Sequence, residues 1–301
     1  MKVLNYREWQ ESCDTLHMIL QMMGKVKLAK MPPQPEWKQC VLHITASGFS
    51  TGLIPDGQEG FEISCDILAA TVSARSTSGG AVQFSLGSKQ SVADYYTRLM
   101  DGLRHIGHET SICTIPQEVY LSETFDKQTQ PVDFDYQAAR EYFKVCLCTY
   151  DAQLRFSSAY RGKKIAPSMF WGTFDLTTVL FSGLAKPFPG KGIIEETAFD
   201  EQMVEFGFWP GDPSAPDPAL FVMAYPFLTK ELSSDAVRPA EAFYSKEKGE
   251  YFLSMAAVAA AAEAGEDPAK LMAEFFADSF KVITESEGWD GLDWFTQPLL
   301  Q

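Results

Sequence analysis

Two long amphipathic stretches constrain the fold of this chain most strongly, because each comes before a group of short strand-like segments. Residues 6–28 and 136–160 both carry apolar side chains at steps of three or four positions, the period of a helix with one buried face. The first stripe consists of Trp9, Cys13, Leu16, Leu20 and Met23. The second consists of Ala139, Phe143, Cys146, Tyr150 and Leu154. We therefore expect two long helices, each packed by one face against a core.

Strand-like segments follow each of these helices at short spacings, which favours antiparallel pairing. After the first helix they are residues 41–47, 61–68, 71–76, 82–86 and 110–119; after the second they are residues 169–181, 203–209, 220–227 and 251–253. Further helices are predicted over residues 91–106 and 255–264, and from Pro268 onward with Asp267 as N-cap. An α+β fold follows, with mainly antiparallel sheets packed against four or five helices.

Both parts of the chain have the order helix, strands, helix. The 301 residues suit one compact unit spanning 1–301, or two halves, 1–125 and 133–301, of similar architecture. The polar stretch 121–133, which lacks periodicity, would then be the linker. No sequence repeat relates the halves, so a duplicated unit stays an open alternative.

The formal net charge of −15 argues against partners that are themselves anionic. Nucleic acid and anionic membrane surfaces would be repelled, so neither is expected as a partner. No apolar run approaches the roughly 20 residues of a membrane-spanning helix, and the polar residues 1–10 do not resemble a signal peptide. The expected location is the cytoplasm, where the cysteines would stay reduced.

The sequence predicts neither a metal nor a cofactor. Its cysteines lack the paired spacing of a zinc site, and the isolated pair His105 and His108 suits a helix C-terminus better than a metal. Gly-x-Ser-x-Gly, Gly-x-Gly-x-x-Gly, phosphate-loop and His-Glu-x-x-His patterns are all absent. The usual signatures of hydrolases, nucleotide-binding proteins and metalloproteases are therefore missing.

The first candidate site lies on the first helix, where Asp14, His17, Gln21 and Lys25 follow each other at steps of three and four. This spacing places them on one face. An acid three residues before a histidine can orient its imidazole, so His17 would act as general acid or base and Asp14 as its partner. The alternative is a helix edge on which both residues make only local hydrogen bonds.

The second candidate is the run 169–176, read as a strand in which Trp171, Thr173 and Asp175 share one face. We expect Asp175 to be catalytic and Trp171 to contact a ligand, with Lys25 also in the ligand-binding set. A sheet with one solvated face is the alternative. The aromatic residues Trp209 and Tyr225, near proline turns, would contact the ligand or fill the core, and Arg238 would hold an anionic group.

Several short blocks occur in the order found in one family. They are Asp14-Thr15-Leu16-His17, Gly24-Lys25-Val26, residues 170–176, residues 207–211, Ala224-Tyr225-Pro226 and Arg238-Pro239. On these blocks the chain resembles, over nearly its whole length, an uncharacterised bacterial family known as a domain of unknown function. The resemblance implies a bacterial, cytoplasmic protein and no particular activity. Members tend to have a histidine where this chain has Ser168 and an arginine where it has Leu180, which weakens a catalytic role for residues 168–180.

Two classes of function remain. In the first, the chain is an enzyme or binding protein for a small polar molecule, held in a cleft lined by acidic, histidine and aromatic side chains. In the second, it is a non-catalytic scaffold or protein-interaction protein in which the same residues only satisfy the core. We favour the first class, because buried ionisable side chains are costly unless they are used or paired.

Overall fold

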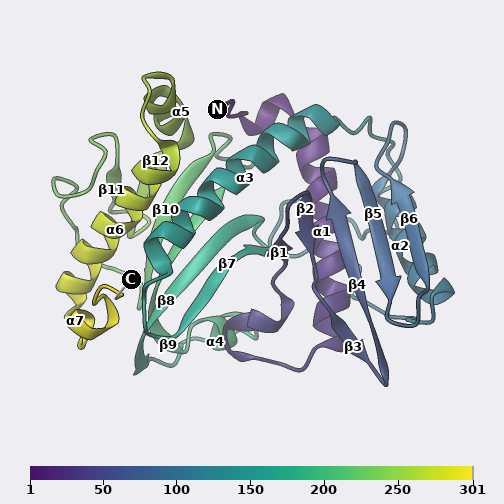
Figure 1. The fold of residues 1–301 in the computed structure, drawn as a ribbon, viewed down its shortest axis with the longest axis horizontal. Coiled ribbons are helices and arrows are strands. Elements are labelled where there is room, and N and C mark those ends of the chain that lie inside the picture. The colour runs from purple at the N-terminus through teal and green to yellow at the C-terminus, as the bar shows by residue number, and fades with distance from the viewer. Residues whose placement is uncertain (300–301) are drawn as a thin grey trace. The chain divides into compact units, whose positions relative to one another are not determined.

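A computed structural model describes residues 1–299 and confirms the α+β fold, with two six-stranded antiparallel sheets and helices around them (Figure 1). The chain divides into two compact units. We call residues 6–143 with 169–174 the N-terminal unit, and residues 1–5 with 144–168 and 175–299 the C-terminal unit. The long helix α3 (Tyr136–Ser157) begins in the first and ends in the second. Whether the proposed halves 1–125 and 133–301 fold separately stays a prediction.

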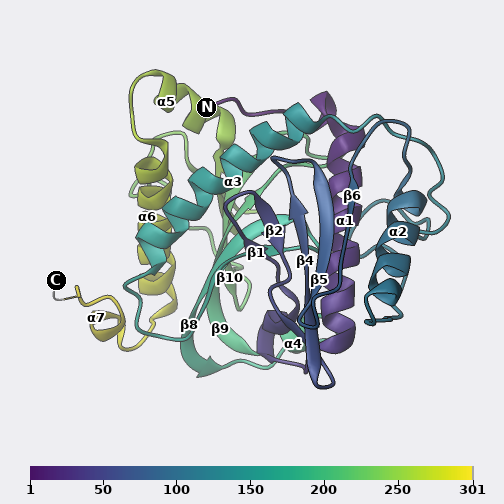
Figure 2. The same ribbon diagram turned by 45° about the vertical axis from the view of Figure 1, so that its right-hand side comes forward.

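The N-terminal unit consists of a sheet with two helices, α1 and α2, on one of its faces (Figures 1 and 2). The strand order is β1-β2-β4-β5-β6, and β3 pairs with the first residues of β4. The elements are a 3-10 turn Tyr6–Glu8, α1 (Gln10–Lys30), a turn Pro35–Cys40, β1 (His43–Ile44), β2 (Gly48–Ser50), β3 (Ile54–Asp56), β4 (Glu59–Asp66), β5 (Thr71–Ser76), β6 (Ala81–Ser85) and α2 (Val92–His105).

Period-two burial explains how this sheet meets its helices. In β4, Phe61, Ile63 and Cys65 are buried, and each is paired with an inward residue of β5. The helix α2 begins at a capping box in which the side chains and backbones of Ser91 and Asp94 exchange hydrogen bonds. The predicted helix over 91–106 is therefore confirmed, with its start fixed by local chemistry.

The C-terminal unit is a second sheet of order β11-β12-β10-β9-β8-β7. Phe206 of β9 contacts the rings of Phe156 on α3 and of Phe276 and Phe280 on α6, so these two helices pack on one face of the sheet. The elements after α3 are β7 (Lys164–Phe170), β8 (Asp175–Ala185), α4 (Glu195–Ala198), β9 (Glu201–Trp209), β10 (Ala219–Tyr225), β11 (Phe243–Ser245), β12 (Glu250–Ser254), α5 (Met255–Glu263), α6 (Pro268–Glu287) and α7 (Leu292–Phe295).

Two strand predictions are wrong. Residues 110–119 are irregular and belong to no sheet, and the run 169–181 is broken by a turn at residues 171–174. Phe174 ends that turn with a φ of 64°, a left-handed conformation outside the region of regular strand residues. Trp171 and Thr173 therefore do not share a strand face with Asp175, which is the first residue of β8.

Candidate functional site

The four polar residues predicted on the first helix do lie along one side of α1, and we call Asp14, His17, Gln21 and Lys25 the α1 polar row. Nearly the whole middle of α1 is buried, so these side chains must find partners inside the protein. Gln21 is 0% exposed, Lys25 5% and His17 8%. The members of the α1 polar row therefore differ in how many hydrogen-bond partners each side chain has.

The irregular segment 111–120, which belongs to no sheet, supplies many of these partners. Lys25 donates from Nζ to the carbonyl of Ile115 at 2.8 Å. The amide of Gln21 makes two hydrogen bonds of 2.7 Å with the backbone of Gln117, one to its carbonyl and one from its N–H. Tyr120 donates its hydroxyl hydrogen to Asp14 Oδ2 at 2.5 Å. The segment thus runs antiparallel to α1, and side chains of the helix take the place of a neighbouring strand.

Asp14 is satisfied by phenols, and not by His17 as predicted. Besides Tyr120, Tyr6 donates to its Oδ1 at 2.8 Å. Burial raises the pKa of the Asp14 carboxyl, although these hydrogen bonds oppose the shift. The correction has a simple cause: two hydroxyl donors reach the carboxylate from outside the helix, and the His17 ring is directed to other partners.

The imidazole of His17 holds the turn at residues 171–174. Its Nε2 lies 2.8 Å from the carbonyl of Trp171 and 3.0 Å from that of Gly172, so this nitrogen carries the hydrogen and donates it. The ring of Phe174 stacks on the imidazole with centroids 4.6 Å apart and planes at 10°. Burial lowers the pKa of His17 to about 4, so the ring is neutral near pH 7. This geometry gives His17 a positioning role.

Lys25 is the member of the row whose hydrogen-bonding capacity is least used. Its ammonium has three hydrogens, and among residues 1–299 its one hydrogen bond is to Ile115 and it forms no ion pair. Nζ lies 5.9 Å from the ring centre of Phe125 and 5.8 Å from that of Trp171, within cation–π range. Burial lowers the pKa of Lys25.

The indole of Trp171 is fixed over this region by backbone contacts. Its Nε1 donates to the carbonyl of Cys40 at 2.9 Å, and its ring lies against Gly24, where any Cβ would overlap it. The neighbouring Lys27 is equally buried, at 4% exposed, but donates to the carbonyl of Val41 at 2.7 Å and has His43 Nε2 at 3.5 Å. Lys27 is therefore better satisfied than Lys25.

The other predicted site residues belong to the C-terminal unit. Asp175 is buried and accepts a short hydrogen bond from the hydroxyl of Thr177. Trp209 is the half-buried last residue of β9. Arg238 is exposed, and its guanidinium already binds Asp278 through two hydrogen bonds of 2.7 and 3.0 Å, which leaves less of its charge for a ligand.

Tyr225 lines a pocket with a volume of about 440 Å³. The pocket walls are largely aromatic and proline side chains from residues 185–189 and 225–227. Tyr225 itself contacts the rings of Phe199 and Phe227 at centroid distances of 5.1 and 5.4 Å. The predicted contact of Tyr225 with a ligand stays a prediction, now with a defined pocket.

Of the predicted residues, the N-terminal unit contains Asp14, His17, Lys25 and Trp171, and Trp171 contacts both His17 and Lys25. Sequence reasoning missed Tyr6, Tyr120 and Phe174 as their partners. Tyr6 and Tyr120 are 114 residues apart, and nothing in a single sequence links them. The contacts of Tyr120, His17 and Lys25 depend on the non-sheet paths of residues 111–120 and 171–174.

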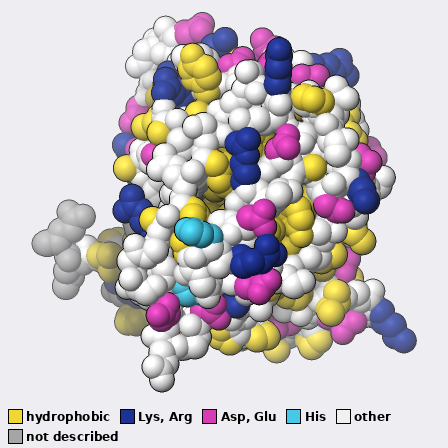
Figure 3. Space-filling model, turned by 90° about the vertical axis from the view of Figure 1, so that its right-hand side faces the viewer, with side chains coloured by type: hydrophobic (Ala, Val, Ile, Leu, Met, Phe, Trp, Pro, Cys, Tyr) yellow, Lys and Arg dark blue, Asp and Glu magenta, His cyan; other side chains and the backbone are white. Residues whose placement is uncertain are grey.

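Three further properties of the described residues concern metal ligands, apolar helices and surface charge. Within residues 1–299, no three histidine, cysteine or acidic side chains are grouped to hold a metal ion. None of the helices described there is both long enough and apolar enough to span a bilayer. On the face of the molecule in Figure 3, basic and acidic side chains are interspersed, without a broad basic patch.

A family model matches nearly the whole chain. The model of a family described as a family of unknown function (DUF5996) matches residues 1–294. None of the curated proteins and none of the solved structures matches this chain. The resemblance to an uncharacterised domain covering nearly the whole chain is therefore confirmed, and it names no reaction.

Proposed function

Because the chain belongs to DUF5996, a family of unknown function, we propose its function from the α1 polar row: it binds a small anionic molecule through the ammonium of Lys25. The observation that carries the proposal is the buried, uncompensated charge of this side chain. Lys25 is 5% exposed, has one carbonyl acceptor and has no carboxylate partner among residues 1–299. Fully buried lysines are rare unless they are paired, so an anionic ligand would supply the missing partner.

The surroundings of Lys25 define the class of ligand. The rings of Phe125 and Trp171 flank the ammonium, so the ligand would combine a negative group with a flat or apolar part. The chain as a whole carries a formal charge of −15, which repels anions at long range. Binding would therefore depend on the local ammonium, and loss of that single charge should abolish it.

Segment 111–120 would give the ligand its route to Lys25. The side chain of Ile115 is 56% exposed, while its carbonyl accepts the hydrogen bond from Nζ. The segment belongs to no sheet, so its displacement breaks contacts with side chains of α1 and no strand pairing. Within the site, Gln21 would hold the backbone at Gln117 in place, and His17 would hold the backbone at Trp171.

A thermal-unfolding screen tests the proposal. Wild-type protein would be heated with a panel of small mono- and dicarboxylates, phosphate esters and sulfonates, beside Lys25→Met and Lys27→Met. A ligand at 100 times its Kd stabilises the native state by about 2.7 kcal/mol. We expect at least one anion to raise the midpoint of the wild type and of Lys27→Met, and none to raise that of Lys25→Met.

Lys27→Met is the matched control, because it removes an equally buried ammonium from the same helix. Lys25→Met removes the cost of burying an ammonium without a counter-ion, but it leaves the carbonyl of Ile115 without this hydrogen bond. These effects oppose each other, so Lys25→Met should have a stability close to that of the wild type. If Lys25→Met instead melts well below the wild type and no anion shifts any of the three proteins, the row is a structural scaffold.

A further inference from the structure

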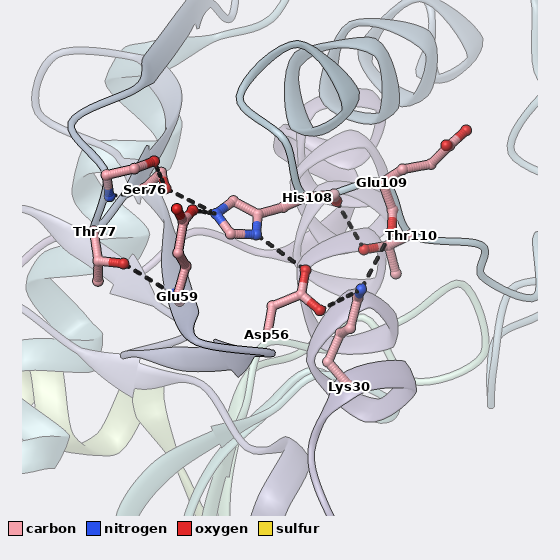
Figure 4. Close-up of polar contacts among 10 residues, drawn as sticks. Lys30, Asp56, Glu59, Ser76, Thr77, His108, Glu109 and Thr110 are labelled. Atoms are coloured by element: carbon pink, nitrogen blue, oxygen red, sulfur yellow. Dashed lines mark hydrogen bonds and ion pairs between the residues drawn. The ribbon is translucent and has the colours of Figure 1, made fainter.

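A second polar cluster in the N-terminal unit is independent of the α1 polar row and is centred on His108 (Figure 4). His108 is 2% exposed. Its Nδ1 lies 3.0 Å from Asp56 Oδ2, and its Nε2 lies 2.8 Å from Ser76 Oγ. Lys30 donates to the other oxygen of Asp56 at 2.9 Å. A serine, a histidine and an aspartate are thus connected in one line of hydrogen bonds.

Local structure fixes each member of this line. The helix α2 ends at His105, and Gly107, two residues further on, has a left-handed φ of 88°. The N–H of His108 then donates to the carbonyl of Leu103 at 2.8 Å. The ring of Phe61 stacks on the imidazole with a centroid distance of 4.6 Å. Asp56 is the last residue of β3 and Ser76 the last residue of β5. The imidazole is therefore held between two strand ends.

The hydrogen-bond donors can be assigned from the chemistry of the end groups. The carboxylate of Asp56 accepts only, so His108 Nδ1 carries a hydrogen and, in the neutral ring, Nε2 has a free electron pair. Ser76 then donates its hydroxyl hydrogen to Nε2, while its Oγ accepts from the N–H of Ser78 at 3.2 Å. Hydrogen bonds from His108 and Lys30 lower the pKa of Asp56, which keeps this carboxyl anionic.

Ser76 is also out of place for a purely structural residue. It occupies the inward face of β5, where it is paired with Phe61 of β4, and the neighbouring inward positions hold Val72 and Ala74. At the same time it adjoins the exposed hairpin turn that contains Ser78, whose hydroxyl lies 2.7 Å from its own. The serine hydroxyl is therefore hydrogen-bonded to a histidine, and the next residues along the chain, 77–79, are exposed.

We infer that Ser76 is a nucleophile that cleaves small carboxylic esters, with His108 as general base and Asp56 as the group that orients the imidazole. Ser76 Oγ forms a bond to the ester carbonyl carbon and its proton passes to His108 Nε2. The ester C–O bond then breaks, and the alcohol leaves with that proton. Water attacks the acyl-serine, its proton passes through His108 to Ser76 Oγ, and the carboxylic acid is released.

Labelling of the full-length protein with a fluorophosphonate, an electrophile that reacts with activated serines, tests this inference. Peptide mass mapping of the wild type should locate one label on Ser76. The rate of labelling and the hydrolysis of 4-nitrophenyl acetate should both fall by at least about 100-fold in Ser76→Ala and His108→Gln. Ser73→Ala, on the same strand but outside the cluster, should keep both rates.

The same experiment separates this inference from the function proposed for Lys25. Labelling of Ser76 is measured on the wild type without any added anion, so its outcome does not depend on whether an anion binds at Lys25. An unlabelled wild type, or a label mapped to a serine other than Ser76, would overturn the inference. Because the map is made on the wild type, a folding defect in a variant cannot obscure the result.

Discussion

Replacement of Gly24 by alanine tests whether α1 is built around the indole of Trp171. A Cβ at position 24 would lie 2.2 Å from both Cδ1 and Nε1 of Trp171 and 2.4 Å from Cε2. These distances are far inside van der Waals contact. The indole cannot move away without loss, because its Nε1 donates to the carbonyl of Cys40 at 2.9 Å.

The change in the free energy of unfolding is the sum of one stabilising and two destabilising contributions. Helix propensity favours alanine over glycine in a helix interior by about 1 kcal/mol. Overpacking a filled site costs about 1–3 kcal/mol, and loss of the Trp171 hydrogen bond, which leaves the carbonyl of Cys40 unpaired, costs about 1–3 kcal/mol more. We therefore expect Gly24→Ala to lower the free energy of unfolding by about 3 kcal/mol, with the sign opposite to that of helix propensity.

Urea unfolding followed by tryptophan fluorescence and circular dichroism measures this change. Gly102→Ala is the matched control, since it places alanine in the interior of α2, where the nearest atom is the Cγ2 methyl of Val82 at 2.9 Å. That side-chain methyl can shift, so the control should stay within about 1 kcal/mol of the wild type. A Gly24→Ala protein as stable as the wild type would refute the packing described for Trp171.

Three further changes have outcomes set by single groups. The pKa of His17 is lowered to about 4, so the native state resists protonation and loses up to about 3 kcal/mol of stability as the pH falls from 6.5 to 4. Urea unfolding at pH 7 and at pH 4.5 should show a smaller loss of stability in His17→Gln than in the wild type. An equal loss in the two proteins would contradict the lowered pKa. Burial raises the pKa of Glu250 to about 7, so its effect on stability has the opposite sign. The free energy of unfolding falls as the pH rises from 4.5 to 7, by about 1–2 kcal/mol after allowance for partial exposure. Glu250→Gln should remove this dependence of stability on pH. Asp267 accepts hydrogen bonds from the N–H groups of Ala269 and Lys270 at the start of α6, so Asp267→Ala should cost about 1 kcal/mol in the same assay, and no change would show that the cap is dispensable.

The parts of the fold that local chemistry determines could be predicted from the sequence. The helix over 91–106 and the start of α6 at Asp267 and Pro268 were recognisable, because capping residues and apolar periodicity act within a few positions. The sheet strands 61–68 and 71–76 followed from alternation and the turns that bound them.

The errors occurred where tertiary partners replace sheet pairing. Residues 110–119 have strand-like composition, but Gln21 and Lys25 bind the backbone of the chain that follows α2 and no strand pairs with it. The run 169–181 is rich in aromatic and β-branched residues, yet Phe174 stacks on His17 in a left-handed conformation that breaks the strand. Neither event has a local signal.

The same limit applied to the candidate site. Helical spacing correctly placed Asp14, His17, Gln21 and Lys25 on one side of α1, since that inference needs only the period of the helix. It paired Asp14 with His17 because the competing donors, Tyr6 and Tyr120, come from distant parts of the chain. Among residues 1–299, Lys25 has no counter-ion because of where all the other polar groups around α1 lie, and a single sequence does not show those positions.

The most direct measurement is the pKa of the Lys25 side chain by NMR of protein with isotope-labelled lysine, with and without the anion selected by the thermal screen. An ammonium that is buried without a counter-ion should titrate below the ordinary value of about 10.4, and the bound anion should raise its pKa. The signal of Lys27 should not respond to the anion. If Lys25 titrates at the ordinary value and no anion changes it, the ammonium is already compensated and the proposed binding site is wrong.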